Sequence, residues 1–279
     1  MKMILATRSS LFRCMLFLLG VLSVSVALPA ARGQVVVNSP VVPGGYAEVE
    51  GNAQLSEPFS LGRVEANSVR LQQVYASSEF LESADPNGGW IYSIGFRADE
   101  GIVTGSYSTY IPNLQIRFSV THRGPDELSP IFAENIGANV SLIVSGGRGI
   151  GVISDGVAPE TFSLFFTFSR PYFYDPSQGN LLLDVINLGG GQLLDRHGNS
   201  GGFDAVNIAG DGVSSVIAND IGNQVPIAGT VSTKGLVTSF RIVPVPEPST
   251  WALLGLAMVI FGGRFCHTLS RRKAHHVTH

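Results

Sequence analysis

Apolar and polar side chains alternate along most of the chain between residues 34 and 243. The clearest case is 113–120, where the apolar residues stand two positions apart: Leu114, Ile116, Phe118 and Val120. A period of two places such side chains on one face of a β-strand. Gly, Pro, Asn and Asp separate these segments, and no helical period of useful length occurs. The pattern therefore predicts an all-β fold.

The same alternation predicts a strand at 90–96. Its core-facing residues are Trp90, Tyr92, Ile94 and Phe96, and its solvent-facing residues are Ser93, Gly95 and Arg97. Further strands are predicted at 69–75, 140–144, 162–168, 181–186, 205–208, 213–217 and 236–243. We predict one antiparallel β-sandwich domain over 34–243, of jelly-roll type. One short helix is expected at 131–136, between an N-cap at Ser129 and a stop at Gly137.

Charge and cysteine content exclude several functions for this domain. It holds 10 of the 18 basic residues and 20 of the 21 acidic residues, a balance of −10. Such a domain repels phosphate backbones, so nucleic acid is not an expected partner. The two cysteines, Cys14 and Cys266, lie outside the domain. A disulfide, a cysteine nucleophile and a thiolate metal site are therefore excluded within it.

Residues 1–33 have the three parts of a secretory signal peptide. A basic start precedes an apolar run at 14–28, and the small residues Ala31 and Gly33 precede the expected cut before Gln34. The apolar run of about 15 residues is shorter than the ~20 that a membrane-spanning helix needs. We therefore expect signal peptidase as a partner, with an uncleaved anchor as the alternative.

Residues 244–279 form a second terminal signal. A proline-rich spacer precedes an apolar segment at 251–269, which as a helix is about 28 Å long and just spans a hydrocarbon core. Arg271, Arg272 and Lys273 follow it and predict a cytoplasmic C-terminus. An ordinary single-pass anchor is one interpretation of this tail.

The order of Pro246-Glu247-Pro248, an apolar helix and a closing basic cluster resembles the PEP-CTERM sorting signal of Gram-negative bacteria. The resemblance covers about 244–273. It implies transient anchoring in the inner membrane and cleavage by an exosortase near the Pro-Glu-Pro. The product would pass to the cell surface or the extracellular polysaccharide matrix. C-terminal segments of this kind are also classified under the name of an ice-binding-protein C-terminal motif. That name implies nothing about binding to ice.

The middle of the chain also resembles, loosely, the uncharacterised sandwich domains of other PEP-CTERM proteins. The similar stretches are 71–75, 126–137 and 174–185. This resemblance implies a β-sandwich and supplies no catalytic residue.

Candidate chemistry in the domain is sparse. Asp195, His197 and Ser200 lie close together, but in a Gly-rich turn rather than in the spatial arrangement of a triad. The glycine run at 146–151 lacks the spacing and the following helix of a phosphate loop and predicts a hairpin turn.

Aspartates recur in the predicted loops, and their oxygens suit Ca²⁺. The candidates are Asp175, Asp184, Asp204 and Asp211, with Asp195 and Asp220 as further loop acids. No EF-hand spacing is present, so solvated carboxylates are the competing interpretation, and no other cofactor is expected. Seven aromatic residues are enough for a sugar-stacking surface: Tyr75, Trp90, Tyr92, Tyr107, Tyr110, Tyr172 and Tyr174. The alternation in 90–96, however, predicts that Trp90 and Tyr92 face the core.

These features favour a non-catalytic protein of the cell envelope or polysaccharide matrix, with a structural or glycan-associated role. The alternative is a polysaccharide hydrolase or lyase on a jelly-roll scaffold. Its acidic pair cannot be identified from the sequence.

Overall fold

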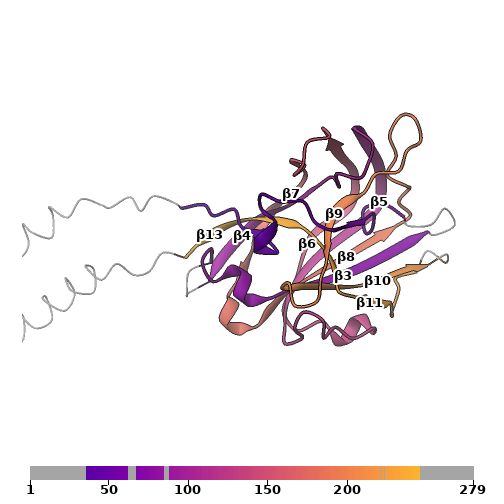
Figure 1. Cartoon of the computed structure of the whole chain (residues 1–279). Helices are drawn as coiled ribbons and strands as arrows, with labels where there is room; N and C mark the ends of the chain where they lie inside the picture. The colour runs from indigo at the N-terminus through magenta and orange to yellow at the C-terminus, as the bar shows by residue number, and fades with distance from the viewer. Residues whose placement is uncertain (1–35, 62–66, 85–87, 221, 223, 246–279) are drawn as a thin grey trace, which may run out of the picture. The chain divides into compact units, whose positions relative to one another are not determined.

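A computed structural model of the chain describes residues 36–61, 67–84, 88–220, 222 and 224–245 (Figure 1). They belong to one compact unit, Val35–Val245. No helix within these residues is long and apolar enough to cross a membrane. The predicted signal peptide, transmembrane segment and sorting residues lie outside the described residues.

The described residues form three antiparallel sheets. Figure 1 shows the strands of these sheets with their labels. The four-stranded sheet has the order β1 (Val41–Val42), β13 (Thr238–Pro244), β4 (Gly89–Arg97) and β7 (Phe162–Tyr174). The six-stranded sheet has the order β11 (Thr230–Ser232), β10 (Val213–Asp220), β3 (Ser68–Tyr75), β8 (Asn180–Leu188), β5 (Gly105–Thr121) and β6 (Ala138–Ser154). A small sheet joins β12 (Lys234–Leu236), β9 (Phe203–Asn207) and β2 (Ala53–Leu55). Four short 3₁₀ helices are η1 (Gly44–Tyr46), η2 (Ser77–Phe80), η3 (Phe132–Glu134) and η4 (Pro176–Gln178). The predicted all-β, antiparallel class is confirmed.

Four strand pairs are nested in the sequence. The pair β5 and β6 is enclosed by β4 and β7, which are enclosed by β3 and β8, and these in turn by β1 and β13. Successive pairs alternate between the six-stranded and the four-stranded sheet. The chain thus folds back on itself around the β5–β6 hairpin, and β9 to β12 are inserted before the last strand.

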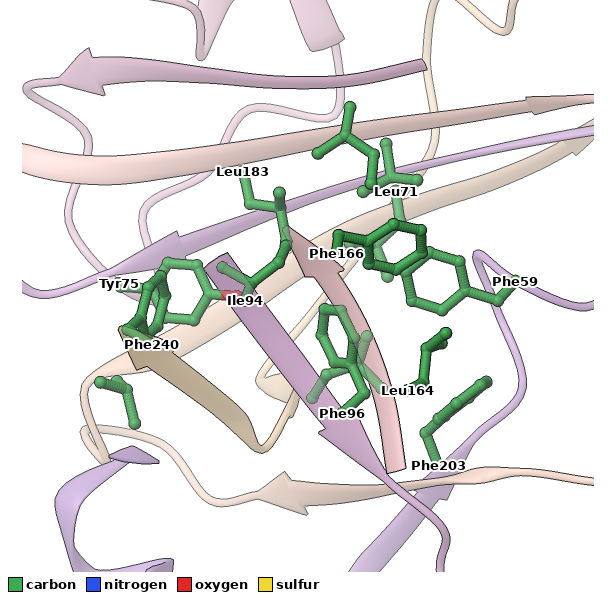
Figure 2. Close-up of a cluster of buried hydrophobic side chains, with 14 of the residues drawn as sticks. Phe59, Leu71, Tyr75, Ile94, Phe96, Leu164, Phe166, Leu183, Phe203 and Phe240 are labelled. Carbon is green, nitrogen blue, oxygen red and sulfur yellow. The ribbon is translucent and has the colours of Figure 1, made fainter. Parts of the chain in front are cut away.

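The two large sheets pack face to face, and Figure 2 shows the aromatic and aliphatic side chains between them. The ring of Tyr75 meets Phe240 edge-on at 5.1 Å between centroids, and Phe118 meets Phe168 at 5.9 Å. The alternating residues of 113–120 are buried as predicted. Burial of these rings is the main driving force for joining the sheets.

The prediction for β4 is wrong at one end. Trp90 and Tyr92 are exposed, whereas Ile91 is buried. The register of β4 shifts between Ile91 and Ser93 against β7, and β13 skips Tyr92 at the same place. A β-bulge with one extra residue interrupts the alternation, so the residues before it change face. Arg97 was predicted to face solvent but is buried. A second register shift between β4 and β7 lies between Phe96 and Arg97.

The structure also differs from one predicted turn and one predicted helix. The glycine run at 146–151 lies inside β6, paired with β5, and is not a hairpin turn. Gly146 has a φ of +103° at a register shift, a conformation that favours glycine. The helix expected at 131–136 is reduced to the 3₁₀ turn η3. Ser129 still acts near its start, because its Oγ accepts a hydrogen bond from the Ile131 N–H at 3.1 Å.

A second apolar cluster lies on the outer face of the six-stranded sheet. It consists of Val74, Leu128, Phe132, Leu182 and Val216. Leu128 and Phe132 come from the segment that leads into η3, so this segment covers the sheet. The four-stranded sheet has no comparable second cluster among the described residues.

Candidate functional site

Three of the four predicted calcium ligands have separate structural tasks. Asp175 caps η4 by accepting the Ser177 N–H at 2.9 Å, and hydrogen bonds from Ser177 lower its pKa. Asp184 forms a buried ion pair with Arg70. Asp211 accepts the Val213 N–H at 3.0 Å, and burial raises its pKa. None of these three belongs to a group of clustered metal-ligand side chains in the described residues.

Asp204 does belong to such a group. Oxygens of Glu50, Asp99 and Asp204 all lie within 4.8 Å of one another. We call these three residues the carboxylate cluster. Glu50 and Asp99 were missed in the sequence because they are distant along the chain and carry no motif. Only the folding of the N-terminal segment onto β4 and β9 brings them together.

Arg97 supplies the positive charge of the carboxylate cluster. Its Nε and Nη2 lie 2.8 and 2.7 Å from Oδ2 of Asp204, and its Nε lies 4.0 Å from Oε2 of Glu50. Nη2 also donates to the carbonyl oxygens of Tyr46 and Val49. The remaining oxygen of Asp204 accepts the Gly51 N–H at 2.8 Å. The arginine thus fastens residues 46–51 to the sheets.

The carboxylate cluster is crowded with negative charge. Burial raises the pKa of Asp204 to about 7 and outweighs the opposing effect of Arg97, while the Glu50 charge adds to the rise. Burial also raises the pKa values of Glu50 and Asp99. Both Glu50 oxygens accept backbone N–H groups, from Glu100 and Glu160 at 3.1 Å. Both Glu50 oxygens are therefore held by backbone groups of the protein itself.

Asp195, His197 and Ser200 form a turn. The Asp195 carboxylate accepts the N–H groups of His197 and Asn199 at 2.8 Å. Nε2 of His197 accepts from Arg196, and Ser200 pairs through its backbone with Leu194. The aspartate and histidine are used within the turn, as the sequence predicted.

The outer face of the four-stranded sheet carries aromatic, hydroxyl and arginine side chains, and we call it the open face. Cross-strand neighbours on β7, β4 and β13 form three rows: Phe165, Gly95 and Ser239; Thr167, Ser93 and Arg241; and Phe173, Trp90 and Val243. These three strands are neighbours in the four-stranded sheet. Side chains alternate across a strand, and the bulge at Tyr92 brings Trp90 to the same face as Ser93 and Gly95, so these rows point away from the core.

A groove of about 390 Å³ lies over the first two rows. It is lined by Ser39, Ser93, Phe165, Thr167, Ser239, Phe240 and Arg241. Phe165 is 54% exposed, and its ring lies over Gly95, where a Cβ atom would approach a ring carbon to 2.5 Å. Glycine is needed there for the ring to lie against the sheet. Beside the groove, Trp90 and Phe173 pack with their centroids 5.1 Å apart.

The charge of the open face is opposite to that of the domain. The strands of the four-stranded sheet contain Arg97, Arg170 and Arg241 and no aspartate or glutamate. Arg97 is buried, whereas Arg170 and Arg241 are exposed. Arg241 takes part in none of the ion pairs among the described residues. Its guanidinium is therefore available to an anion.

Comparison with known protein families identifies a motif in the C-terminal segment of the chain. The PEP-CTERM protein-sorting motif matches residues 244–264, a segment that includes Pro246, Glu247 and Pro248. The chain therefore carries the signal of exported proteins that an exosortase processes for the cell envelope or surface. The predicted Arg271, Arg272 and Lys273 lie beyond the matched segment.

Two further comparisons cover the whole chain. No curated protein matches the chain. A chain of the Merkel cell polyomavirus virus-like particle is 10% identical, with 80% of this chain and 71% of that chain covered, at a TM-score of 0.12. A score this low carries no argument about fold or function.

Proposed function

We propose that the protein is a non-catalytic component of the cell surface or extracellular matrix whose domain holds polysaccharide. Signal peptidase removes residues 1–33, and an exosortase in the inner membrane of a Gram-negative bacterium cleaves near Pro246–Pro248. The domain then acts in structural association with glycans. The open face is the observation that carries this proposal.

The open face has the side chains that a sugar needs. Exposed rings such as Phe165 and Trp90 offer flat apolar surfaces to the C–H faces of a pyranose. Ser93, Thr167 and Ser239 offer hydroxyl groups that both donate and accept hydrogen bonds. The nested strand pairs support a jelly-roll sandwich, on which a sheet face forms a rigid floor for such contacts.

The residue types in the groove support the non-catalytic proposal. Glycoside hydrolysis uses two carboxyl groups on either side of the scissile bond. None of the residues that line the groove is acidic. Asp204 of the carboxylate cluster is fully buried and bonded to Arg97. A hydrolase or lyase is therefore the less favoured alternative.

The experiment is incubation of the processed protein with polysaccharide from the matrix of its own host. We expect retention of the protein on the polysaccharide in a co-sedimentation assay. No reducing ends or unsaturated products should be released after prolonged incubation. Release that one Asp→Asn or Glu→Gln substitution abolishes would establish the enzyme instead.

A further inference from the structure

We propose that the open face selects acidic polysaccharides, with Arg241 pairing with the carboxylate of a uronic acid and Phe165 stacking on a sugar ring. This inference rests on the proposed function and adds a class of ligand and its binding residues. Both side chains line the same groove, and they come from β7 and β13 on either side of β4.

Charge complementarity favours a polyanion on this face. The domain carries −10 overall, so an acidic polymer is repelled by most of its surface. The strands under the open face contribute no acidic residue, and Arg241 has no intramolecular ion-pair partner among the described residues. A guanidinium binds a carboxylate through two parallel hydrogen bonds, which gives both strength and orientation.

The aromatic residues favour a sugar polymer over a small anion. Phe165 lies beside the arginine row, and the pair formed by Trp90 and Phe173 offers a second stacking position. Gly95 and Trp90 are five residues apart on β4, which corresponds to roughly 15 Å along an extended strand. Two stacking positions at this distance on one face match a ligand that extends over several sugar units.

The test uses polygalacturonate and its fully methyl-esterified form as probes. The two polymers have the same sugar backbone, and only the first is charged. We expect the processed protein to bind polygalacturonate at least 10-fold more tightly in affinity electrophoresis at low salt. Binding to polygalacturonate should weaken as salt is raised, whereas binding to the ester should not.

Two substitutions separate the contribution of the Arg241 charge to binding from that of the Phe165 ring. Arg241→Gln is expected to remove the preference for polygalacturonate and to leave binding to the ester unchanged. The matched control is Arg148→Gln, which removes an exposed arginine from β6 of the other sheet. Gly95→Ala should displace the Phe165 ring and weaken binding to both polymers about 10-fold. Its control is Tyr110→Ala, which removes an exposed ring from β5.

The outcomes distinguish the two proposals. Equal binding of both polymers would overturn the acidic class and leave the glycan function standing. Absence of binding to both of them and to the host's own matrix polysaccharide would overturn the glycan function. Equal or stronger binding to vesicles of phosphatidylglycerol would overturn the sugar assignment in favour of a membrane surface.

Discussion

The outer faces of the two large sheets are built from similar strands but differ in what covers them. The face of the six-stranded sheet is covered by the segment that leads into η3, and Phe132 and Leu128 form a second core on it. Backbone hydrogen bonds from Phe132 to Ile227 and from Gly229 to Pro130 fasten this cover. The open face of the four-stranded sheet keeps its rings and its arginine in solvent.

The difference between the faces is also a difference in how charge is compensated. On the covered face, Arg70 Nε and Nη2 bond to both oxygens of Asp184 at 2.9 and 2.7 Å, and the guanidinium lies 4.5 Å from the Phe132 ring centroid. An arginine that is buried under a covered sheet face needs an internal counter-charge of this kind. On the open face, Arg241 has none among the described residues. The first arrangement stabilises the fold, and the second leaves a charge for a ligand.

The largest expected effect is on the covered face. Asp184→Asn leaves Arg70 buried without its counter-charge and should lower the free energy of unfolding by about 3–5 kcal/mol. Urea denaturation of the fragment 34–245 measures this loss. Polysaccharide binding by the fraction that remains folded should not change.

A double substitution is the control for this result. Arg70→Met combined with Asp184→Leu removes both charges and should recover most of the lost stability. A double variant as unstable as Asp184→Asn would show that packing around the pair, not the lone charge, causes the loss.

The carboxylate cluster predicts an intermediate, pH-dependent effect. Burial raises the pKa of Asp204 to about 7, so the folded domain binds this proton more tightly than the unfolded chain does. The resulting stability is complete below the ordinary aspartate pKa near 4 and is lost as pH rises through 7. The raised pKa values of Glu50 and Asp99 act in the same direction.

Thermal and urea unfolding between pH 5 and 8 measure this dependence. The free energy of unfolding should fall by about 2 kcal/mol over this range. Asp204→Asn should flatten the profile, because an amide does not titrate. A wild-type profile that rises steadily from pH 5 to 8 would contradict the raised pKa of Asp204.

A smaller effect is expected from the open face itself. Trp90 is 41% exposed and contacts Phe173, so Trp90→Ala should cost about 1 kcal/mol or less of unfolding free energy while it weakens polysaccharide binding. Urea denaturation and co-sedimentation on the same sample separate the two effects. A loss above 3 kcal/mol would show that this ring belongs to the core.

Dithiothreitol should have no effect on the domain. Cys14 and Cys266 lie in the two terminal signals, and residues 34–245 contain no thiol. A melting temperature of the processed protein that falls with the reductant would show that a terminal segment is retained.

The sequence predicted the strands well because their alternation is local. Leu114, Ile116 and Phe118 needed only the period of two to be assigned to the core. The open face was not predicted, because a single bulge residue at Tyr92 exchanges the faces of β4. Phe165 carried one usable signal, since it is a large apolar residue at a solvent-facing position of its strand. A phenylalanine at such a position marks an exposed aromatic surface.

The carboxylate cluster could not be predicted for a different reason. Glu50, Asp99 and Asp204 come from three distant parts of the chain, and their approach depends on the packing of a loop, not on a pattern. Arg97 was misplaced because the alternation of β4 put it in solvent. Its burial depends on a second irregularity and on carboxylates that the strand itself does not contain.

Trp90 provides the most direct test of the central claim, that the open face binds acidic polysaccharide. The chain has two tryptophans, Trp90 and Trp251, so fragment 34–245 fluoresces through Trp90 alone. Titration with oligogalacturonate should change its emission and protect it from acrylamide quenching. Arg241→Gln should move both effects to at least 10-fold higher ligand concentrations, whereas Arg148→Gln should not. Binding that leaves the emission and the quenching of Trp90 unchanged would place the ligand elsewhere and contradict the account.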